Sequence, residues 1–329
     1  MRRLALLFAA LVATSAAFAE PIGVSAQRIA SFSRTSPAET QFGPLSFLGG
    51  LVLTSDNAHF GGFSGLRIGA DGASFHAISD RAHWLTGRIA YEGEAPAGIE
   101  AAELFPVRGP DGKPIAGTRG GDTEALEISG SIAFVPTEGR HQVLRFALGR
   151  GAEKARGAKL PGAEAMADLG RNAGIEAIGM VSDGPEKGTL LIIAEEPPEA
   201  GADHPAWLVS GLTTKPVRAL GFKNRDGYAV TDMAFLPGGD LVVLERRYRP
   251  LFSLNMRLRR IALATIAEGA SLDGEVLLEA SLGGHDIDNM EALSAHRAAD
   301  GRTVLTLMSD DNFNRAQKTI LLQFALADD

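Results

Sequence analysis

The chain has no cysteine in its 329 residues. Disulfide bonds, thiolate nucleophiles and cysteine-ligated zinc sites are therefore excluded. The seven histidines show no His-x-x-x-His or comparable zinc-binding spacing. The chemistry of any site must come from carboxylates, hydroxyls, imidazoles and the basic side chains.

Several well-known catalytic and nucleotide-binding motifs are also missing. There is no Gly-x-x-x-x-Gly-Lys-Ser/Thr phosphate loop and no dinucleotide fingerprint after a strand. The segment from Gly62 to Leu66 resembles a nucleophile elbow, but leucine stands where Gly-x-Ser-x-Gly requires the second glycine. The formal net charge of −8 argues against nucleic acid as a partner, because nucleic-acid binding needs a basic face.

Long apolar runs are scarce. The N-terminus has Arg2 and Arg3, an apolar run over residues 4–12, and Ala17-Phe18-Ala19 before Glu20. This pattern predicts a secretory signal peptide over residues 1–19, cleaved after Ala19. Its apolar run is too short to span a membrane, and no later run reaches the roughly 20 residues that a spanning helix needs. We expect residues 20–329 to form a single exported domain, periplasmic or secreted, that does not span a membrane.

Signals for β-strands dominate the rest of the chain. Short runs rich in Ile, Leu, Val and Phe alternate with glycine-containing turns, such as residues 237–240 before the run 241–244. Helical periodicity is weak. The Ala- and Arg-rich segments 151–170 and 255–269 are expected to form short helices or loops.

One motif recurs five times along the chain. An acidic residue stands beside a small residue and an aliphatic one, and the apolar run that follows usually ends in a second acid. The motif starts at positions 64, 124, 176, 232 and 291, at intervals of 52 to 60 residues. Repeats of about fifty residues that contain several short strands are typical of β-propeller blades.

The repeats predict an all-β fold, a β-propeller with five legible blade repeats. A sixth, degenerate blade built from segments 22–55 and 81–118 remains open. The last repeat has room for only three strands, so we expect the N-terminal strand to close the ring. A pair of β-sandwiches is the rival fold, but it would not place acids at equivalent points of every repeat.

Matching positions of successive blades converge on the central channel of a propeller. The first acids of the motif are Glu124, Glu176, Asp232 and Glu291, with Ser64 in the same slot of repeat one. The second acids are Asp80, Glu138, Glu195, Glu245 and Asp310. Converging carboxylates repel one another unless neutralised, and Ca²⁺ suits them because it takes six to eight oxygen ligands in loose geometry. The predicted metal ligands are Glu124, Glu176, Asp232, Glu291, Asp80, Glu195 and Asp310. Alternatively, the first acids accept hydrogen bonds from the backbone of neighbouring blades.

Basic residues follow several of the second acids. Arg81 comes directly after Asp80, Arg246 follows Glu245, and Arg315 lies five residues after Asp310. Arginine and a metal together bind phosphoryl oxygens, so these three arginines are predicted to bind a small anionic, phosphorylated substrate or ligand. The alternative is that they form salt bridges around the rim of the channel.

The residues of these motifs, and the order of the motifs along the chain, resemble those of a known family. The segments that carry the resemblance are Gly62-Phe63-Ser64-Gly65-Leu66, Asp122-Thr123-Glu124-Ala125-Leu126, Gly174-Ile175-Glu176-Ala177-Ile178, Asn289-Met290-Glu291-Ala292-Leu293 and Leu307-Met308-Ser309-Asp310-Asp311-Asn312. Together they resemble the bacterial phytase-like family described as having esterase-like activity of phytase. The resemblance implies a β-propeller, export, and a distant relation to calcium-dependent phytases, whose six-bladed channel binds calcium ions that bridge substrate phosphates.

We therefore expect a metal-dependent phosphoester or ester hydrolase that acts at the channel, with calcium as its cofactor. Two rivals remain at this point. One is a non-catalytic periplasmic propeller that binds a ligand or a partner protein, since a propeller hosts both kinds of function. The other is a scaffold that calcium only stabilises.

Overall fold

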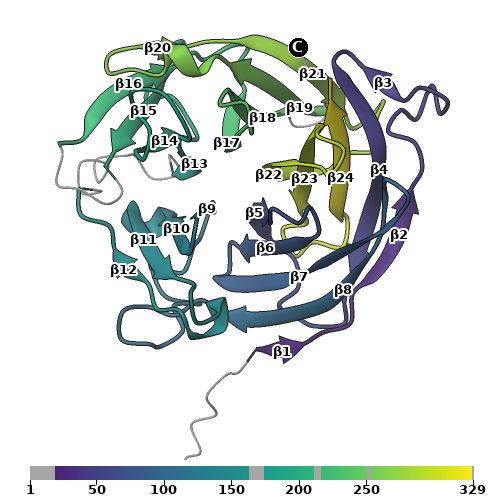
Figure 1. Cartoon of the computed structure of the whole chain (residues 1–329), viewed down its shortest axis with the longest axis horizontal. Coiled ribbons are helices and arrows are strands. Elements are labelled where there is room, and N and C mark those ends of the chain that lie inside the picture. Colours follow the sequence, from purple (N-terminus) through teal and green to yellow (C-terminus); the bar gives the residue numbers. More distant parts are fainter. Residues whose placement is uncertain (1–18, 163–173, 211–215, 250–252, 328–329) are drawn as a thin grey trace, which may run out of the picture.

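The computed structural model describes residues 19–162, 174–210, 216–249 and 253–327. These residues form five sheets arranged around a central axis, with short 3-10 helices as their only helical elements (Figure 1). All strand pairs within these sheets are antiparallel except the short outer pair β16–β20. The prediction of an all-β propeller with five blades is confirmed. None of the described helices has the length and apolar character needed to cross a membrane.

Each blade is a sheet whose first strand lies nearest the axis. Blade one contains β5 (Phe63–Ile68), β6 (Ser74–Ser79), β7 (His83–Glu92) and β8 (Ala95–Pro106), with the short β1 (Glu20–Pro21) outside. Blade two contains β9 (Glu127–Ser129), β10 (Ile132–Thr137), β11 (Gln142–Ala147) and β12 (Ala158–Lys159). Blade three contains β13 (Ile175–Met180), β14 (Leu190–Ala194), β15 (His204–Val209), β16 (Arg218–Phe222) and β20 (Ser271–Leu272). Blade four contains β17 (Ala229–Phe235), β18 (Leu241–Arg249), β19 (Ser253–Ile261) and β21 (Glu275–Ser281).

Blade five joins the two ends of the chain. Its inner strands are β22 (Asn289–Arg297), β23 (Thr303–Asp310) and β24 (Thr319–Leu326), and its outer strands are β4 (Leu45–Thr54), β2 (Ser25–Ile29) and the short β3 (Gln41–Phe42). Strand β24 pairs antiparallel with β4 from Thr319, opposite Leu53, to Leu326, opposite Leu45. Closure by the N-terminal strand is thus confirmed. The possible sixth blade is wrong, because segment 22–55 completes blade five and segment 81–118 supplies the outer strands of blade one.

The hydrophobic core is divided among the blade interfaces. Five clusters of buried apolar side chains lie between successive blades, for example Trp84 and Phe105 of blade one against Phe146 of blade two. A single blade cannot cover both of its faces, so the closed ring is what buries these side chains. Burial of apolar area is the main favourable term in folding.

One segment has a secondary structure that differs from the one predicted. Segment 255–269 was expected to form a helix or loop, but its first part, residues 255–261, belongs to strand β19, and a 3-10 turn over Leu263–Thr265 follows. Arg257 and Arg259 stand on alternate residues of this strand and both point to Glu245 of β18. In segment 151–170, the described part holds a 3-10 turn (Ala152–Lys154) and β12, while residues 163–173 lie outside the described residues. The predicted signal peptide also falls almost entirely outside them, on residues 1–18.

A single side chain crosses the centre of the propeller. Arg67 of β5 donates hydrogen bonds to partners in all five blades. Its acceptors are the carbonyl oxygens of Leu66, Ile178, Met233 and Leu293 and the carboxylates of Glu127 and Asp232, at 2.6 to 3.3 Å. The Arg67 guanidinium therefore separates the two ends of the channel, and each end is a site of its own.

Candidate functional site

A β-bulge marks the start of the inner strand in four blades. The strand register shifts between Phe63 and Gly65, between Ile175 and Ala177, between Val230 and Asp232, and between Met290 and Ala292. The extra residues are Ser64, Glu176, Thr231 and Glu291. A bulge leaves its extra residue outside the ladder and re-aims its side chain, so this local distortion turns Glu176 and Glu291 toward the end of the channel.

The register corrects the sequence alignment in blade four. Thr231, not Asp232, occupies the slot of Glu176 and Glu291, and Asp232 takes the place of the small residue that follows. The Asp232 carboxylate is fully buried and accepts hydrogen bonds from the backbone N–H groups of Met233 and Leu293, both at 2.7 Å. Leu293 belongs to the next blade. The Asp232 carboxylate thus accepts the backbone hydrogen bonds that were expected under the alternative to metal binding. It also forms an ion pair with Arg67, at 3.3 Å.

We define the acidic mouth as the channel end where the inner strands begin. Its carboxylates are Asp80, Asp122, Glu124, Glu138, Glu176, Glu195, Glu291 and Asp310. The backbone holds three of the second acids in the same way: Asp80, Glu138 and Glu195 donate their N–H groups to Gly62, Asp122 and Gly174, at 2.8 to 3.0 Å. Each acceptor lies two residues before the first slot of its own blade, so the repeat brings the two acidic positions together.

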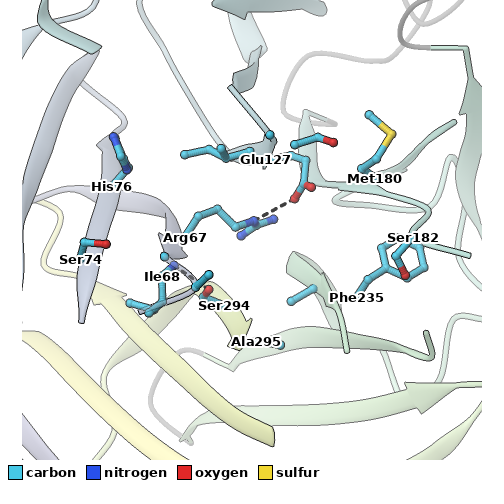
Figure 2. A pocket seen from close by; sticks show the side chains of 16 residues that line it. Arg67, Ile68, Ser74, His76, Glu127, Met180, Ser182, Phe235, Ser294 and Ala295 are labelled. Carbon is cyan, nitrogen blue, oxygen red and sulfur yellow. Dashed lines mark hydrogen bonds and ion pairs between the residues drawn. The ribbon is translucent and has the colours of Figure 1, made fainter. Parts of the chain in front are cut away.

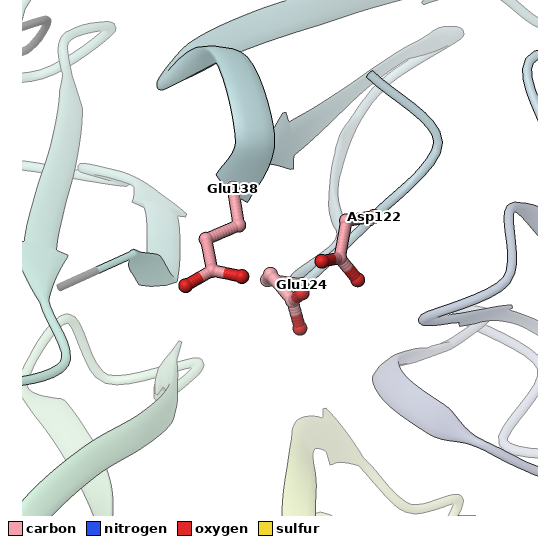
Figure 3. A group of neighbouring side chains, drawn as sticks. All are labelled: Asp122, Glu124 and Glu138. Atoms are coloured by element: carbon pink, nitrogen blue, oxygen red, sulfur yellow. The ribbon is translucent and has the colours of Figure 1, made fainter. Parts of the chain in front are cut away.

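Three of these carboxylates form a compact group in blade two (Figure 3). Asp122, Glu124 and Glu138 each offer an oxygen atom, and the three atoms lie within 4.8 Å of one another. The sequence predicts Glu124 as a metal ligand and Glu138 as a second acid, whereas Asp122 has no predicted role. Asp122 and Glu124 are two residues apart in an extended segment, and this spacing places side chains on the same side of the backbone.

Burial and mutual repulsion raise the pKa values of this mouth. Burial, followed by the charge of Asp122, raises the pKa of Glu124 well above its usual range, and burial with the charge of Glu124 does the same for Glu176. Burial raises the pKa values of Glu195 and Glu291 to about 7. Raised pKa values of this kind mean that the described side chains neutralise the carboxylates only poorly. Each carboxylate therefore favours a bound proton or a nearby cation.

Two further acids sit at the side of the mouth formed by blades one and five. Burial, with the charge of Asp310, raises the pKa of Asp80 to about 7, and burial raises that of Asp310 to about 6. The buried Oδ1 of Asp80 has no hydrogen-bond partner among the described residues. Gly62 faces this atom with a φ of +63°, and a Cβ there would collide with it. Glycine at this position thus leaves room for the Asp80 carboxylate.

A comparison with protein families matches residues 58–313 to the phytase-like family, described as having esterase-like activity of phytase. The chain belongs to this phytase-like family. Among solved structures, the chain is similar to the PQQ-bound aldose sugar dehydrogenase from Streptomyces coelicolor, at 13% identity and a TM-score of 0.43, covering 93% of this chain and 100% of that one. A search of curated proteins finds no match.

Arg246 is the cation that the phytase-like fold places inside the acidic mouth. It lies on β18, and its Nη1 is 2.6 Å from Glu291 Oε1 while its Nη2 is 3.3 Å from Glu195 Oε1. Nη1 also donates to the side-chain oxygen of Asn289. Arg246 therefore links blades three, four and five, and it partly neutralises the acids that flank it.

The other two predicted arginines lie differently. Arg81 is exposed and stacks over the ring of Phe313, with its guanidinium carbon 3.4 Å from the ring centroid. Phe313 adopts a left-handed conformation with a φ of +48°, which is unusual for a bulky residue. Arg315 is exposed in the same loop and forms no ion pair with a described residue. Arg81 thus has a fixed place at the rim, whereas nothing ties Arg315 to the acids.

The Glu245 side chain does not face the channel. Its carboxylate is fully buried inside blade four, where it accepts hydrogen bonds from Arg257 and Arg259 at 2.7 to 3.0 Å. The two arginines reach it from the paired strand β19. This second acid therefore has a structural role and contributes nothing to the acidic mouth.

Proposed function

We propose that this protein is an exported, metal-dependent hydrolase of phosphoesters or carboxylic esters, with the acidic mouth as its active site. One observation carries the proposal: the phytase-like chain gathers Asp122, Glu124 and Glu138 within 4.8 Å at the end of the channel. Export rests on the signal-peptide pattern of residues 1–19 and is tested by the N-terminal sequence of the mature protein.

The residues present fit a calcium ion. Asp122, Glu124 and Glu138 supply hard, anionic oxygen atoms at a separation that one cation can bridge, and Glu176 and Glu195 lie beside them as further donors. Calcium accepts six to eight such ligands without strict geometry. When bound, the metal would supply a Lewis acid that polarises the ester oxygen and activates water.

The chain's own residues would perform three tasks. Arg246 holds Glu195 and Glu291 in place and limits the negative charge that an anionic substrate meets. Arg81, fixed on Phe313 at the rim, offers a cation to a phosphoryl or carboxylate oxygen. Arg67 closes the channel behind the acids, so that substrate enters and product leaves through the same mouth.

Hydrolysis adds the elements of water across the ester bond and releases an alcohol together with a phosphate or carboxylate, so no further co-reactant is needed. The half-buried carboxylate of Asp80, at the side of the mouth, would accept a hydrogen bond from a water molecule at the site. Asp80 would thereby orient water without forming a covalent bond to the substrate.

The proposal is tested by hydrolysis of p-nitrophenyl phosphate, p-nitrophenyl acetate and phytate, each with calcium and with a chelator. We expect calcium-dependent turnover of at least one substrate, and its loss in the Glu124→Gln, Glu138→Gln double variant. Glu100→Gln, at a surface position of β8, is the matched control and should keep full activity. Turnover of none of the three substrates would contradict the proposal and favour a binding propeller.

A further inference from the structure

A cavity of about 600 Å³ lies at the end of the channel opposite the acidic mouth. We call it the vestibule. It is lined by residues near the ends of the inner strands, including Ile68 of β5, Met180 of β13 and Phe235 of β17 (Figure 2). Ser129 of β9 also lines it. Arg67 forms its floor and separates it from the acids. The volume falls in the range of pockets that bind small molecules, about 300 to 1,000 Å³.

The charged side chains that line the vestibule are already paired. Arg67 and Glu127 are the charged side chains among the described residues that line it, and they pair with each other at 2.9 Å. The guanidinium of Arg67 already donates to carbonyl and carboxylate oxygens of all five blades. It therefore has little capacity left for a ligand, and an anion would find no free cation here.

The vestibule nevertheless offers polar groups that the protein does not use. The imidazole of His76 and the hydroxyls of Ser129 and Ser182 line the cavity and have no hydrogen-bond partner among the described residues. Burial lowers the pKa of His76, so its ring is neutral near pH 7 and offers one donor and one acceptor. Each serine hydroxyl can likewise donate and accept.

Apolar side chains form the rest of the wall. Ile68, Ile128, Met180 and Phe235 line the cavity between these polar groups. A small-molecule site typically combines apolar walls with a few placed polar groups. The two ends of the channel thus differ in chemistry: one concentrates negative charge, and the other is neutral and amphipathic.

We propose that the vestibule binds an uncharged, hydroxyl-bearing ligand of sugar or polyol size. Its hydroxyl groups would bond to His76, Ser129 and Ser182, and its C–H surface would pack against Met180 and Phe235. A charged ligand would have to be buried without a partner, which is costly. This inference does not depend on the function of the acidic mouth, because Arg67 separates the two sites.

The test uses the whole protein in the presence of a chelator, which suppresses anion binding through metal at the acidic mouth. Glucose, myo-inositol and maltose are titrated by calorimetry, with glucose 6-phosphate and gluconate as charged counterparts. We expect at least one uncharged probe to bind, and its charged counterpart to bind tenfold more weakly or not at all. Failure of all three uncharged probes, or equal affinity for glucose and glucose 6-phosphate, would overturn the proposal.

Variants place the binding in the vestibule. His76→Gln and Ser182→Ala should each weaken binding of the uncharged probe about three- to tenfold, the effect of losing one hydrogen bond. Ser182 is exposed, so its variant is expected to fold normally. Ser36→Ala, another exposed serine, and Glu138→Gln in the acidic mouth are controls that should leave binding unchanged. Unchanged affinity in both vestibule variants would refute the assignment.

A spectroscopic readout gives an independent check. The ring of Trp84 lies 6.4 Å from that of His76, and the chain has one other tryptophan, Trp207. In a Trp207→Phe variant, the uncharged probe should shift the emission of Trp84 with the same affinity that calorimetry measures. Binding heat without any change in Trp84 emission would place the ligand elsewhere and contradict the proposal.

Discussion

Removing the metal should destabilise this protein, and the effect should be larger at about pH 8 than at about pH 5. At the higher pH the carboxyls of the acidic mouth must ionise while they are buried and close to one another. A bound cation would neutralise these carboxylates, whereas removal of the cation by a chelator leaves them to repel one another. The perturbation is therefore a chelator, and the variable is pH.

Glu291 sets the scale of the effect. Burial raises its pKa from 4.5 to about 7, so in the metal-free fold it stays protonated at pH values where the unfolded chain has already released the proton. Metal-free stability is then lost as the pH rises from about 4.5 to about 7. Each pKa unit corresponds to about 1.4 kcal/mol, which gives about 3 kcal/mol for this group alone. At about 2 °C per kcal/mol, this amounts to about 6 °C in Tm.

The assay is thermal unfolding with calcium and with chelator at both pH values. Burial also lowers the pKa values of His76, His204 and His296, which makes the fold gain stability as the pH rises. These histidines contribute equally with and without calcium, so the difference in Tm between the two conditions isolates the acidic mouth. We expect a difference of about 6 °C or more at pH 8 and a smaller one at pH 5. Equal Tm values at pH 8, or a larger difference at pH 5, would refute the reasoning.

Three further predictions concern buried charges. Arg67→Met should lower the free energy of unfolding by about 3 to 5 kcal/mol in urea denaturation, because it leaves Glu127 and Asp232 buried without their cation; a loss below about 1 kcal/mol would contradict the central role of this side chain. Glu245→Gln should cost a similar amount, since it leaves two buried arginines of β19 without a counter-ion, and calcium affinity should not change. Asp232→Asn should destabilise the fold but leave calcium affinity unchanged, whereas Glu176→Gln should weaken calcium binding. The reverse pattern would show that Asp232, and not Thr231, is the equivalent of Glu176 in blade four.

The number of blades and their closure could be read from the sequence because both follow from repetition. Five motifs at similar intervals predict five equivalent blades. The last repeat is too short for four strands, which predicts that another part of the chain completes its blade. The ambiguity over a sixth blade arose from segment 81–118. Strands β7 and β8 there are 10 and 12 residues long, so the outer half of blade one takes up an unusually long stretch of sequence.

The details of the site depend on strand register, which a single sequence does not reveal. A bulge shifts the slot in blade four by one residue, from Asp232 to Thr231, and only the pairing with β18 shows it. Glu245 ends an apolar run like the other second acids, but it lies inside β18, where it pairs with the arginines of β19 instead of facing the channel. The central position of Arg67 could not be predicted from the sequence, because its partners are mostly backbone carbonyls from distant segments.

Calorimetric titration of the chelator-treated protein with calcium tests the central claim most directly. We predict binding of calcium to the native chain, and loss of that binding in the variant that carries both Glu124→Gln and Glu138→Gln. The Glu100→Gln variant should bind like the native chain. Absence of binding in the native protein, or undiminished binding in the double variant, would contradict the assignment of the acidic mouth as a metal centre.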